Sequence, residues 1–456
     1  MGHSMFEYDE AFANAVFEYC RDRLSMSPVP LDFGGLAKVP LAELAAQIRP
    51  EGHPPAEVLD FFRDELAPAV VSIDAPNFLA FIPNAPTKNS LLFDMVVACS
   101  GLNGTSWLES AGVVAAENQA LTFLANQAGM PEGSGGAFVS GGSMGNLSGL
   151  TVGRDVGRFL HPEIEPRSIR FAVSSDAHSS VGKALHVIGV DEFLVPTVDH
   201  RLTRESLELA LASDPHPENV LGVVATAGTT NAGIVDDIEG LGAFARENGM
   251  WFHVDGAYGG ASLFSSTHRH LLEGVRHADS FVVDPHKWLF APLDCAALIY
   301  RNPTVARKIL AQQASYLDVL HTGDDEHYEW NPADFALHLS RRARGLPFWF
   351  SLVTNGVHAY ETAVQAAIDL AAFSARLIES SAHVELVREP TLSIVLLRRP
   401  GWSAERYTQW SHKLLLDQVA FVTPTKWEGE TVARFAFLHP NTTRETVEAI
   451  IESMRD

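Results

Sequence analysis

Residues 279–290 read Asp-Ser-Phe-Val-Val-Asp-Pro-His-Lys-Trp-Leu-Phe, a short apolar run followed by reactive side chains. Ser280–Val283 predict a buried strand, and Asp284-Pro285 predict its end. His286 and Lys287 therefore stand at the carboxyl end of a strand, where open α/β sheets bind their ligands. A lysine at that place suits a Schiff base with an aldehyde such as pyridoxal phosphate (PLP), although a lysine considered alone is better interpreted as a surface residue after a turn.

A second segment, Met250-Trp-Phe-His-Val-Asp-Gly-Ala-Tyr258, gives this lysine its context. It is another apolar run that ends in one carboxylate, Asp255. The separation of Asp255 and Lys287 in the sequence matches one strand–helix–strand unit of ~30 residues. A carboxylate and an amine then emerge at one sheet edge, as the pyridine nitrogen and the aldehyde carbon of PLP require.

Around these two segments, short β-rich runs alternate with helical stretches from Gly135 to about Tyr300. This alternation predicts an α/β fold with a mostly parallel seven-stranded sheet and helices on both faces. The seven runs are Ala137–Ser140, Ile169–Ser174, Glu192–Val195, Val220–Ala225, Trp251–Val254, Ser280–Val283 and Ala296–Ile299.

The regions on either side predict two smaller units and a lid. Residues 1–75 carry helical spacing at Phe6–Leu24 and Leu41–Ile48, and we expect an arm that packs across a dimer interface. Residues 76–345 form the large PLP-binding domain, in which the polar stretch 311–334 is expected to be a mobile catalytic loop. Residues 346–456 are expected to form a small α+β domain, with one long helix at 346–377, a strand pair that includes 392–397, and helices at 405–418 and 444–454.

Composition limits the possible partners and compartments. The chain has 56 acidic and 33 basic residues, a net charge of −23, which argues against nucleic acid or an anionic membrane as a partner. Cys20, Cys99 and Cys295 are too few and too scattered for a disulfide framework, and we recognise no signal peptide and no membrane helix. A cytoplasmic enzyme is expected.

Further strand ends carry groups that suit the remaining parts of PLP. The segment Ser140-Gly-Gly-Ser-Met-Gly-Asn146 follows a strand and opens a helix, which predicts a phosphate-binding site. The segment lacks the glycine spacing of nucleotide-binding loops. His178, just after another strand, offers a flat imidazole for stacking, although a loop histidine without ligand is the alternative. Thr229 and Thr230 end a further strand with hydroxyl groups that suit the ring oxygen or a substrate carboxylate. Four such strand ends together are far more specific than one.

These motifs resemble the group II PLP-dependent amino acid decarboxylases, a family that includes the aromatic-L-amino-acid, tyrosine, histidine and glutamate decarboxylases. The resemblance rests on Asp-Ala-His-Ser-Ser-Val, Ala-Thr-Ala-Gly-Thr-Thr, His-Val-Asp-Gly-Ala-Tyr, Asp-Pro-His-Lys-Trp and Ser340-Arg-Arg-Ala-Arg-Gly. It covers residues from about 76 to the carboxyl end. It implies the fold-type I architecture and a homodimer with active sites at the subunit interface.

The resemblance also implies roles for individual residues. Lys287 would bind PLP covalently, Asp255 would pair with the pyridinium nitrogen, and His178 and Ala257 would pack on opposite faces of the ring. Tyr316, on the mobile loop, would return a proton to the product. The other implied cofactor contacts are Gly142, Ser143, Met144, Thr230 and His286, and the implied substrate contacts are Phe81, Ile82, Asn103, Thr105 and Arg434.

Departures from the family pattern bear on the substrate. In the aromatic decarboxylases two bulky apolar residues of the partner subunit, just before a Ser-Trp pair, help to wall the pocket. Here Asn103 and Thr105 precede Ser106-Trp107, and we expect them to face the cofactor of the partner subunit. Ile82 replaces a common aromatic residue, but Phe81 is retained. Ser340 matches the serine of some plant relatives that act on phenolic substrates. We favour tyrosine, DOPA or tryptophan, with glutamate, 2,4-diaminobutyrate, lysine and histidine as alternatives.

Other functions were weighed against decarboxylation. A decarboxylating aldehyde synthase is the nearest alternative, but that activity tends to accompany loss of the residues matching Tyr316 or His178, which are both present. A catalytically inactive scaffold is disfavoured by Lys287 and Asp255. A zinc site at His268, His270 and His277 is disfavoured because no cysteine or histidine nearby completes a tetrahedral set.

Overall fold

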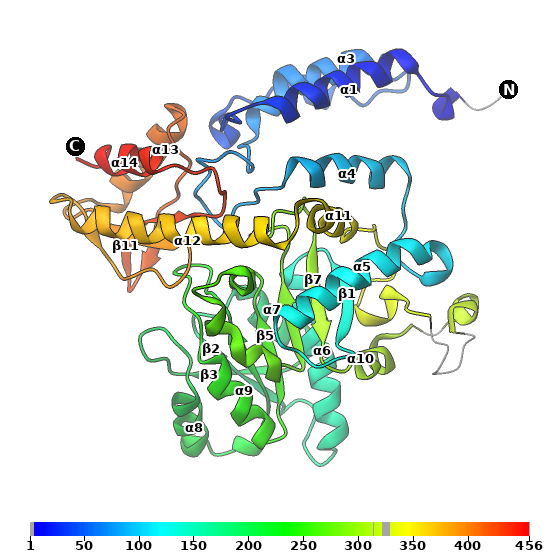
Figure 1. Cartoon of the computed structure of the whole chain (residues 1–456), viewed down its shortest axis with the longest axis vertical. Coiled ribbons are helices and arrows are strands. Elements are labelled where there is room, and N and C mark those ends of the chain that lie inside the picture. Colours follow the sequence, from blue (N-terminus) through cyan, green and yellow to red (C-terminus); the bar gives the residue numbers. More distant parts are fainter. Residues whose placement is uncertain (1–3, 313, 322–328, 456) are drawn as a thin grey trace.

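The structure is a computed structural model that describes residues 4–312, 314–321 and 329–455. Its centre is a seven-stranded sheet with the order β1-β7-β6-β5-β4-β2-β3 (Figure 1). All strands run parallel except β7, which is antiparallel to both β1 and β6. The predicted mostly parallel sheet is confirmed. The strands are β1 Gly135–Val139, β2 Arg170–Ser174, β3 Asp191–Val195, β4 Val220–Thr226, β5 Trp251–Asp255, β6 Ser280–Val283 and β7 Ala296–Tyr300.

Helices cover both faces of this sheet. Helices α6, α7 and α10 pack on one face, and α5, α8 and α9 pack on the other. Buried strands explain this arrangement, because β1, β4, β6 and β7 are apolar on both faces. The helices are α5 Trp107–Gln127, α6 Gly142–Leu160, α7 Ser179–Ile188, α8 Arg204–Ser213, α9 Ile238–Glu247 and α10 Pro303–Leu310.

The carboxyl-terminal part is a four-stranded antiparallel sheet with helices. Its strand order is β10-β11-β9-β8. The single long helix predicted at 346–377 is wrong: two helices occupy this region, and they meet at Gly356, whose φ of 75° no helix interior can accommodate. The elements are α11 Leu346–Asn355, α12 Val357–Glu379, β8 Glu385–Leu386, β9 Ile394–Arg398, α13 Ala404–Leu416, β10 Thr425–Trp427, β11 Glu430–Ala436 and α14 Arg444–Glu452.

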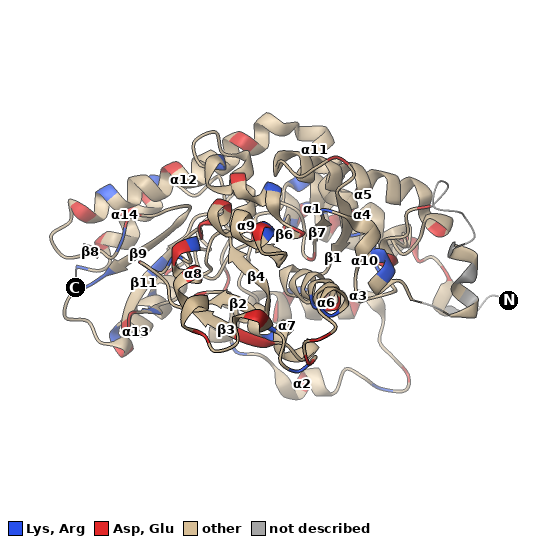
Figure 2. Cartoon of the chain, turned by 90° about the horizontal axis from the view of Figure 1, so that it is seen from below, with Lys and Arg blue, Asp and Glu red and all other residues tan. Residues whose placement is uncertain are grey.

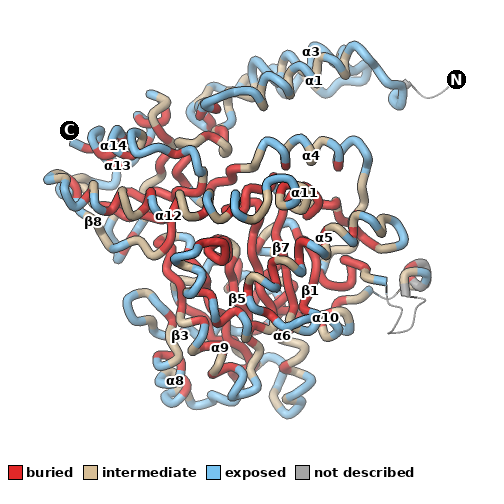
Figure 3. Tube along the Cα trace, in the orientation of Figure 1, coloured by how far each residue is buried: buried red, intermediate tan, exposed pale blue. Residues whose placement is uncertain are grey.

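The amino-terminal segment contributes little to the core. Helices α1 (Glu10–Ser25) and α3 (Pro55–Phe61) lie at one end of the molecule, and neither has a buried residue (Figures 1 and 3). Between them and residues 67–74 is a hollow of about 730 Å³, the largest of those described, but it contains no group of the predicted active site. The other α-helices of this part are the short α2 (Leu41–Ala45) and the longer α4 (Lys88–Cys99).

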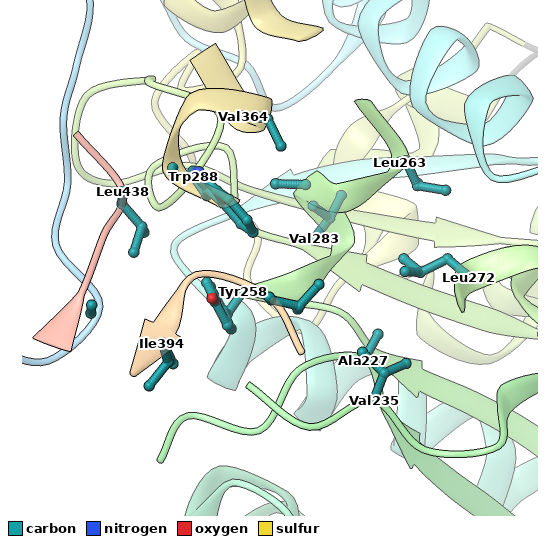
Figure 4. Packing of buried hydrophobic residues seen from close by; sticks show 14 of the residues in the cluster. Ala227, Val235, Tyr258, Leu263, Leu272, Val283, Trp288, Val364, Ile394 and Leu438 are labelled. Atoms are coloured by element: carbon teal, nitrogen blue, oxygen red, sulfur yellow. The ribbon is translucent and has the colours of Figure 1, made fainter. Parts of the chain in front are cut away.

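One hydrophobic cluster joins the two sheets. It includes Leu263 and Val283 beside the large sheet, and Ile394 and Leu438 from the carboxyl-terminal part (Figure 4). Tyr258 stacks on Trp288 with ring centroids 5.3 Å apart, and its hydroxyl lies 2.6 Å from Ser393 Oγ. The segments that follow β5 and β6 are therefore packed directly against β9.

The surface of the molecule carries charges of both signs. On α8, for example, Arg204 is followed by Glu205 and Glu208, and α12 carries Glu361, Asp369 and Arg376 (Figure 2). In the described ranges no helix has the length and apolar character needed to cross a membrane.

The predicted loop 311–334 has 3-10 turns at Ser315–His321 and Pro332–Phe335, whereas its predicted centre, residues 323–326, lies outside the described residues.

Candidate active site

A pocket of about 200 Å³ lies at the carboxyl ends of the parallel strands. Five chain segments reach it, each just after β1, β2, β4, β5 or β6. This is the edge at which open α/β sheets bind ligands. Its lining consists of Gly141, Gly142, Ser143, Asn146, His178, Ser180, Thr226, Gly228, Thr230, Asp255, Ala257, Tyr258, Asp284, His286 and Lys287.

Lys287 enters the pocket from the turn that follows β6. Its backbone N–H donates to the Asp284 carbonyl, and its Nζ lies 2.9 Å from Asp284 Oδ2. Burial alone would lower the pKa of Lys287, but the Asp284 carboxylate, helped by Asp255, raises this pKa above its ordinary value. In the ligand-free chain the amine is therefore an ammonium held by a carboxylate.

Asp255 lies at the end of β5 and is held by two N–H donors. The Nδ2 amide of Asn146 donates to Oδ2 over 2.8 Å, and the Ala257 backbone N–H donates to Oδ1 over 3.1 Å. Asn146 Oδ1 lies 3.0 Å from Nε2 of the buried His253. Because this oxygen can only accept, Nε2 carries the proton, and Nδ1 accepts from Ser280 Oγ at 2.7 Å. Burial lowers the pKa of His253 to about 4, so the imidazole is neutral at pH 7.

His178 is the residue just before α7 and serves as its N-cap. Its Nδ1 accepts from the Ser180 backbone N–H at 3.2 Å and lies 2.8 Å from Ser180 Oγ. That hydroxyl also accepts from Asn146 Nδ2 at 3.1 Å. The orientation of the imidazole is therefore coupled to Asn146, which also contacts Asp255.

The glycine-rich turn brings the amino end of α6 to the pocket. A Cβ atom on Gly142 would lie 2.8 Å from the Ala257 methyl group and 3.0 Å from Asp284 Oδ2, so only glycine allows this approach. His286 Nδ1 accepts the Cys295 backbone N–H at 2.9 Å, which leaves Nε2 as the ring nitrogen that can donate to a ligand. Burial lowers the pKa of His286.

These groups fit PLP. The pocket combines one amine, one carboxylate, one imidazole and one helix amino end, as the aldehyde, pyridine nitrogen, ring face and phosphate of PLP require. Thr226 Oγ1 and Asp284 Oδ1 are buried in it without a hydrogen-bond partner among the described residues. Buried polar atoms of this kind call for a ligand or a water as partner.

Eight of the nine predicted cofactor residues line this pocket, and Met144 does not. Met144 packs against the cluster formed by Val139, Val282 and Leu298 on the α6 side of the sheet. The helical phase explains the difference, since Ser143 and Met144 point in different directions from the start of α6. The eight are Gly142, Ser143, His178, Thr230, Asp255, Ala257, His286 and Lys287.

The structure brings none of the five predicted substrate residues into the pocket lining. Phe81 is 61% exposed, with a φ of 53°, and Ile82 packs against the main core. Arg434, on β11, donates to the backbone carbonyls of Phe81, Thr230 and Asn231. Three of the five guanidinium N–H groups are thus engaged by backbone carbonyls.

Asn103 and Thr105 lie in the turn before α5 and contact each other. Asn103 Oδ1 accepts the Thr105 backbone N–H at 3.0 Å, and Asn103 Nδ2 donates to Glu109 Oε1 at 2.7 Å. Their prediction as partner-facing residues is not tested by a single chain. The backbone of Tyr316 belongs to the turn Ser315–His321, but its side chain lies outside what the structure describes.

Several residues that line the pocket have no role predicted from the sequence. Asn146 and Asp284 stand inside the quoted motifs, but nothing in their spacing says that Asn146 contacts Asp255 or that Asp284 contacts Lys287. The first contact depends on how α6 lies against β5, and the second on the turn that follows β6. The residues without a prediction are Gly141, Asn146, Ser180, Thr226, Gly228, Tyr258 and Asp284.

One protein family and several known proteins match most of this chain in sequence. Residues 36–399 match the family described as the pyridoxal-dependent decarboxylase conserved domain. The aromatic-L-amino-acid decarboxylase of Bacillus atrophaeus is 30% identical, over 91% of this chain and 87% of that protein. The phenylacetaldehyde synthase of Petunia hybrida is 28% identical, over 87% and 83%.

A solved structure has the same fold. Oryza sativa TDC, crystallised with PLP and tryptamine, superposes with a TM-score of 0.87 over 97% of each chain. Its sequence is 23% identical to this one, so this likeness concerns the fold alone.

Proposed function

Because the chain belongs to the pyridoxal-dependent decarboxylase family, we propose that it converts an aromatic L-amino acid into the corresponding amine and carbon dioxide. Decarboxylation with PLP follows from the family, and the aromatic substrate is our proposal. It is supported by the relative that is 30% identical, an aromatic-L-amino-acid decarboxylase. The single observation that carries the assignment of the site is the convergence of Lys287, Asp255 and His178 on one pocket.

We assign each part of PLP to a residue of this pocket. Lys287 would bind the aldehyde carbon, and Asp255 would hold a proton on the pyridine nitrogen. His178 and Ala257 would pack against the ring, and Thr230 would lie near the ring oxygen. Gly142, Ser143 and His286 would hold the phosphate, because the amino end of α6 offers N–H donors and His286 offers Nε2–H.

When bound, PLP supplies a conjugated ring that accepts the electron pair left on Cα by loss of carbon dioxide. The chain provides the electrostatic setting for this step. Asp255 would favour the protonated form of the pyridine nitrogen, since an adjacent negative charge favours the charged form of a base. Asn146 and the Ala257 N–H hold the carboxylate in place. Tyr316, as proposed, then delivers a proton to Cα from the loop 311–334.

The substrate is tested by an activity screen with purified protein. Carbon dioxide and amine release are followed with tyrosine, DOPA and tryptophan, and in parallel with glutamate, 2,4-diaminobutyrate, lysine and histidine. We expect the highest kcat/KM with one of the aromatic amino acids. A preference for any of the other four would contradict the proposal. Aldehyde and ammonia are measured as well, because one relative is a phenylacetaldehyde synthase.

The role of Lys287 is tested by Lys287→Ala. The side chain reaches a pocket instead of packing in the core, so the variant should fold normally while it loses turnover and the absorbance near ~420 nm that a PLP Schiff base gives. Lys183→Ala, on the outer helix α7, is the control and should behave like the unaltered enzyme. Appreciable decarboxylation by Lys287→Ala would exclude Lys287 as the PLP-binding residue.

We also propose a homodimer in the cytoplasm, with residues 1–75 as an arm that crosses to the partner, 76–345 as the large domain and 346–456 as the small domain. In support, helices α1 and α3 have no buried residue, and their apolar side chains are exposed to solvent: Phe17 is 51% and Val58 46% exposed. Such apolar faces need a partner surface. In the dimer Asn103 and Thr105 would face the partner's cofactor. Light scattering should give the mass of a dimer, and an active monomer would contradict this arrangement.

A further inference from the structure

Asp284 is a carboxylate inside the pocket that the roles proposed above do not use. It follows β6 directly and is 2% exposed. Its Oδ2 lies 2.9 Å from Lys287 Nζ and accepts the Gly142 backbone N–H at 3.1 Å. One oxygen thus contacts both the amine that would bind the aldehyde of PLP and the helix end that would bind its phosphate.

The contact with α6 involves both carboxylate oxygens. A Cβ atom on Gly142 would meet Oδ2 at 3.0 Å and Oδ1 at 3.2 Å, so the whole carboxylate lies against the first residue of the helix. Oδ1 is buried and has no hydrogen-bond partner among the described residues. The Asp284 carboxylate therefore stands at the amino end of α6, which is suited to bind an external anion.

The contact with Lys287 opposes formation of the Schiff base. For that bond the amine must first give up its proton, after which the nitrogen lone pair attacks the aldehyde carbon. A C=N bond then replaces the C=O bond, and the oxygen leaves as water. A carboxylate at hydrogen-bond distance favours the ammonium form, which has no lone pair to donate. Asp255, which also acts on Lys287, is farther away and is held by Asn146.

We propose that Asp284 restrains cofactor loading: it holds Lys287 as an ammonium and competes with the PLP phosphate for the amino end of α6. This inference rests on the proposed function, in which Lys287 is the PLP-binding residue. Loading then requires Asp284 to release both partners. Of the titratable groups that contact this carboxylate, Lys287 stands at 2.9 Å and His286 Nε2 at 3.5 Å.

The test measures loading of the full chain after its cofactor has been removed. The protein is mixed with PLP or with pyridoxal, which has the aldehyde but no phosphate, and the absorbance near ~420 nm is followed in time. Asp284→Asn keeps the shape and removes the charge. We expect the larger neutral fraction of Lys287 alone to speed loading about tenfold, because a neighbouring opposite charge shifts a pKa by ~1–3 units and each unit changes the neutral fraction about tenfold. Loss of the competition for the phosphate position should add to this acceleration with PLP. With pyridoxal the acceleration should be smaller, since only the effect on Lys287 remains.

The matched control is Asp279→Asn, at the residue immediately before β6. Asp279 accepts the Phe252 backbone N–H at 2.9 Å at the opposite end of β6, so its loading rate should equal that of the unaltered chain. Asp284→Ser provides a second neutral variant if Asp284→Asn folds poorly. Inorganic phosphate should also slow PLP loading more strongly in the neutral variants, because the helix end is free.

The possible outcomes separate this inference from the proposed function. Unchanged or slower loading of both neutral variants with PLP would overturn the role of Asp284. Equal acceleration with PLP and pyridoxal would overturn competition for the phosphate position. If the unaltered chain forms no Schiff base that depends on Lys287, as judged with Lys287→Ala, the proposed function itself fails.

Discussion

The side-chain amide of Asn146 donates to the Asp255 carboxylate over 2.8 Å, and the same nitrogen lies 3.1 Å from Ser180 Oγ. Ser180 in turn contacts His178 Nδ1. One side chain on α6 thus aligns the carboxylate proposed for the pyridine nitrogen and the imidazole proposed for the ring face. Because Asn146 is 1% exposed, water cannot take over these contacts.

Asn146→Ala should therefore weaken PLP binding and lower kcat. The change leaves Asp255 with one donor and removes the acceptor of His253 Nε2, and buried groups left unpaired cost ~1–3 kcal/mol, or about 10- to 100-fold in affinity. PLP titration by fluorescence and steady-state kinetics measure the two effects. Asn248→Ala, at the exposed end of α9, is the control. PLP affinity equal to that of the control would contradict the alignment role.

Asp255→Asn tests charge separately from shape. We expect most activity to be lost and PLP to dissociate more readily, because the pyridinium loses its counter-charge. The side-chain shape is kept, but only one of the two N–H donors, Asn146 Nδ2 and the Ala257 N–H, still finds an acceptor. Asp255→Ala should lose both charge and contacts and bind PLP more weakly still. The comparison uses kcat and the PLP dissociation constant. A near-normal kcat for the Asn variant would show that the charge of Asp255 is not needed.

The buried His253 predicts a pH-dependent stability. Its pKa is about 4 in the folded chain and ~6.5 in an unfolded one, so the unfolded state binds the proton first as the pH falls. Stability is thus unaffected by this group above pH ~6.5 and decreases from there towards pH ~4, by up to about 3 kcal/mol. His253→Gln should lack this part of the loss. Urea unfolding at pH 7.5 and 4.5 measures it, and identical pH profiles would refute it.

Tyr316→Phe tests the proposed proton donor. The variant keeps the ring and loses the hydroxyl, so PLP binding should stay intact while amine release falls and aldehyde and ammonia rise. Carbon dioxide, amine, aldehyde and ammonia are measured together for both proteins. Tyr300→Phe is the control, since the Tyr300 hydroxyl is buried against the Phe335 carbonyl away from the pocket. Amine release at the normal rate without aldehyde would remove Tyr316 from the mechanism.

The sequence predicts the sheet and the polar ends of its strands for one physical reason. Buried parallel strands are short apolar runs, and their carboxyl ends share an edge, so Lys287, Asp255 and His178 were expected together. Contacts that depend on the packing of elements were not predictable. The Asn146–Asp255 contact requires the position of α6 against β5, and Met144 faces the core because of the helical phase. The break at Gly356 was missed because the apolar periodicity continues through it.

Arg434 offers a route to redesign. It joins β11 to the segments around Phe81 and Thr230 through carbonyl oxygens, which every amino acid possesses. The side chains at positions 81 and 230 can accordingly be exchanged while the guanidinium keeps its three acceptors, whereas the Asn231 amide should be kept because it bonds to Thr425 and Lys426. A library at these positions would vary the chemistry beside the pocket without dismantling the framework that supports it, and new substrate preferences should be sought there first.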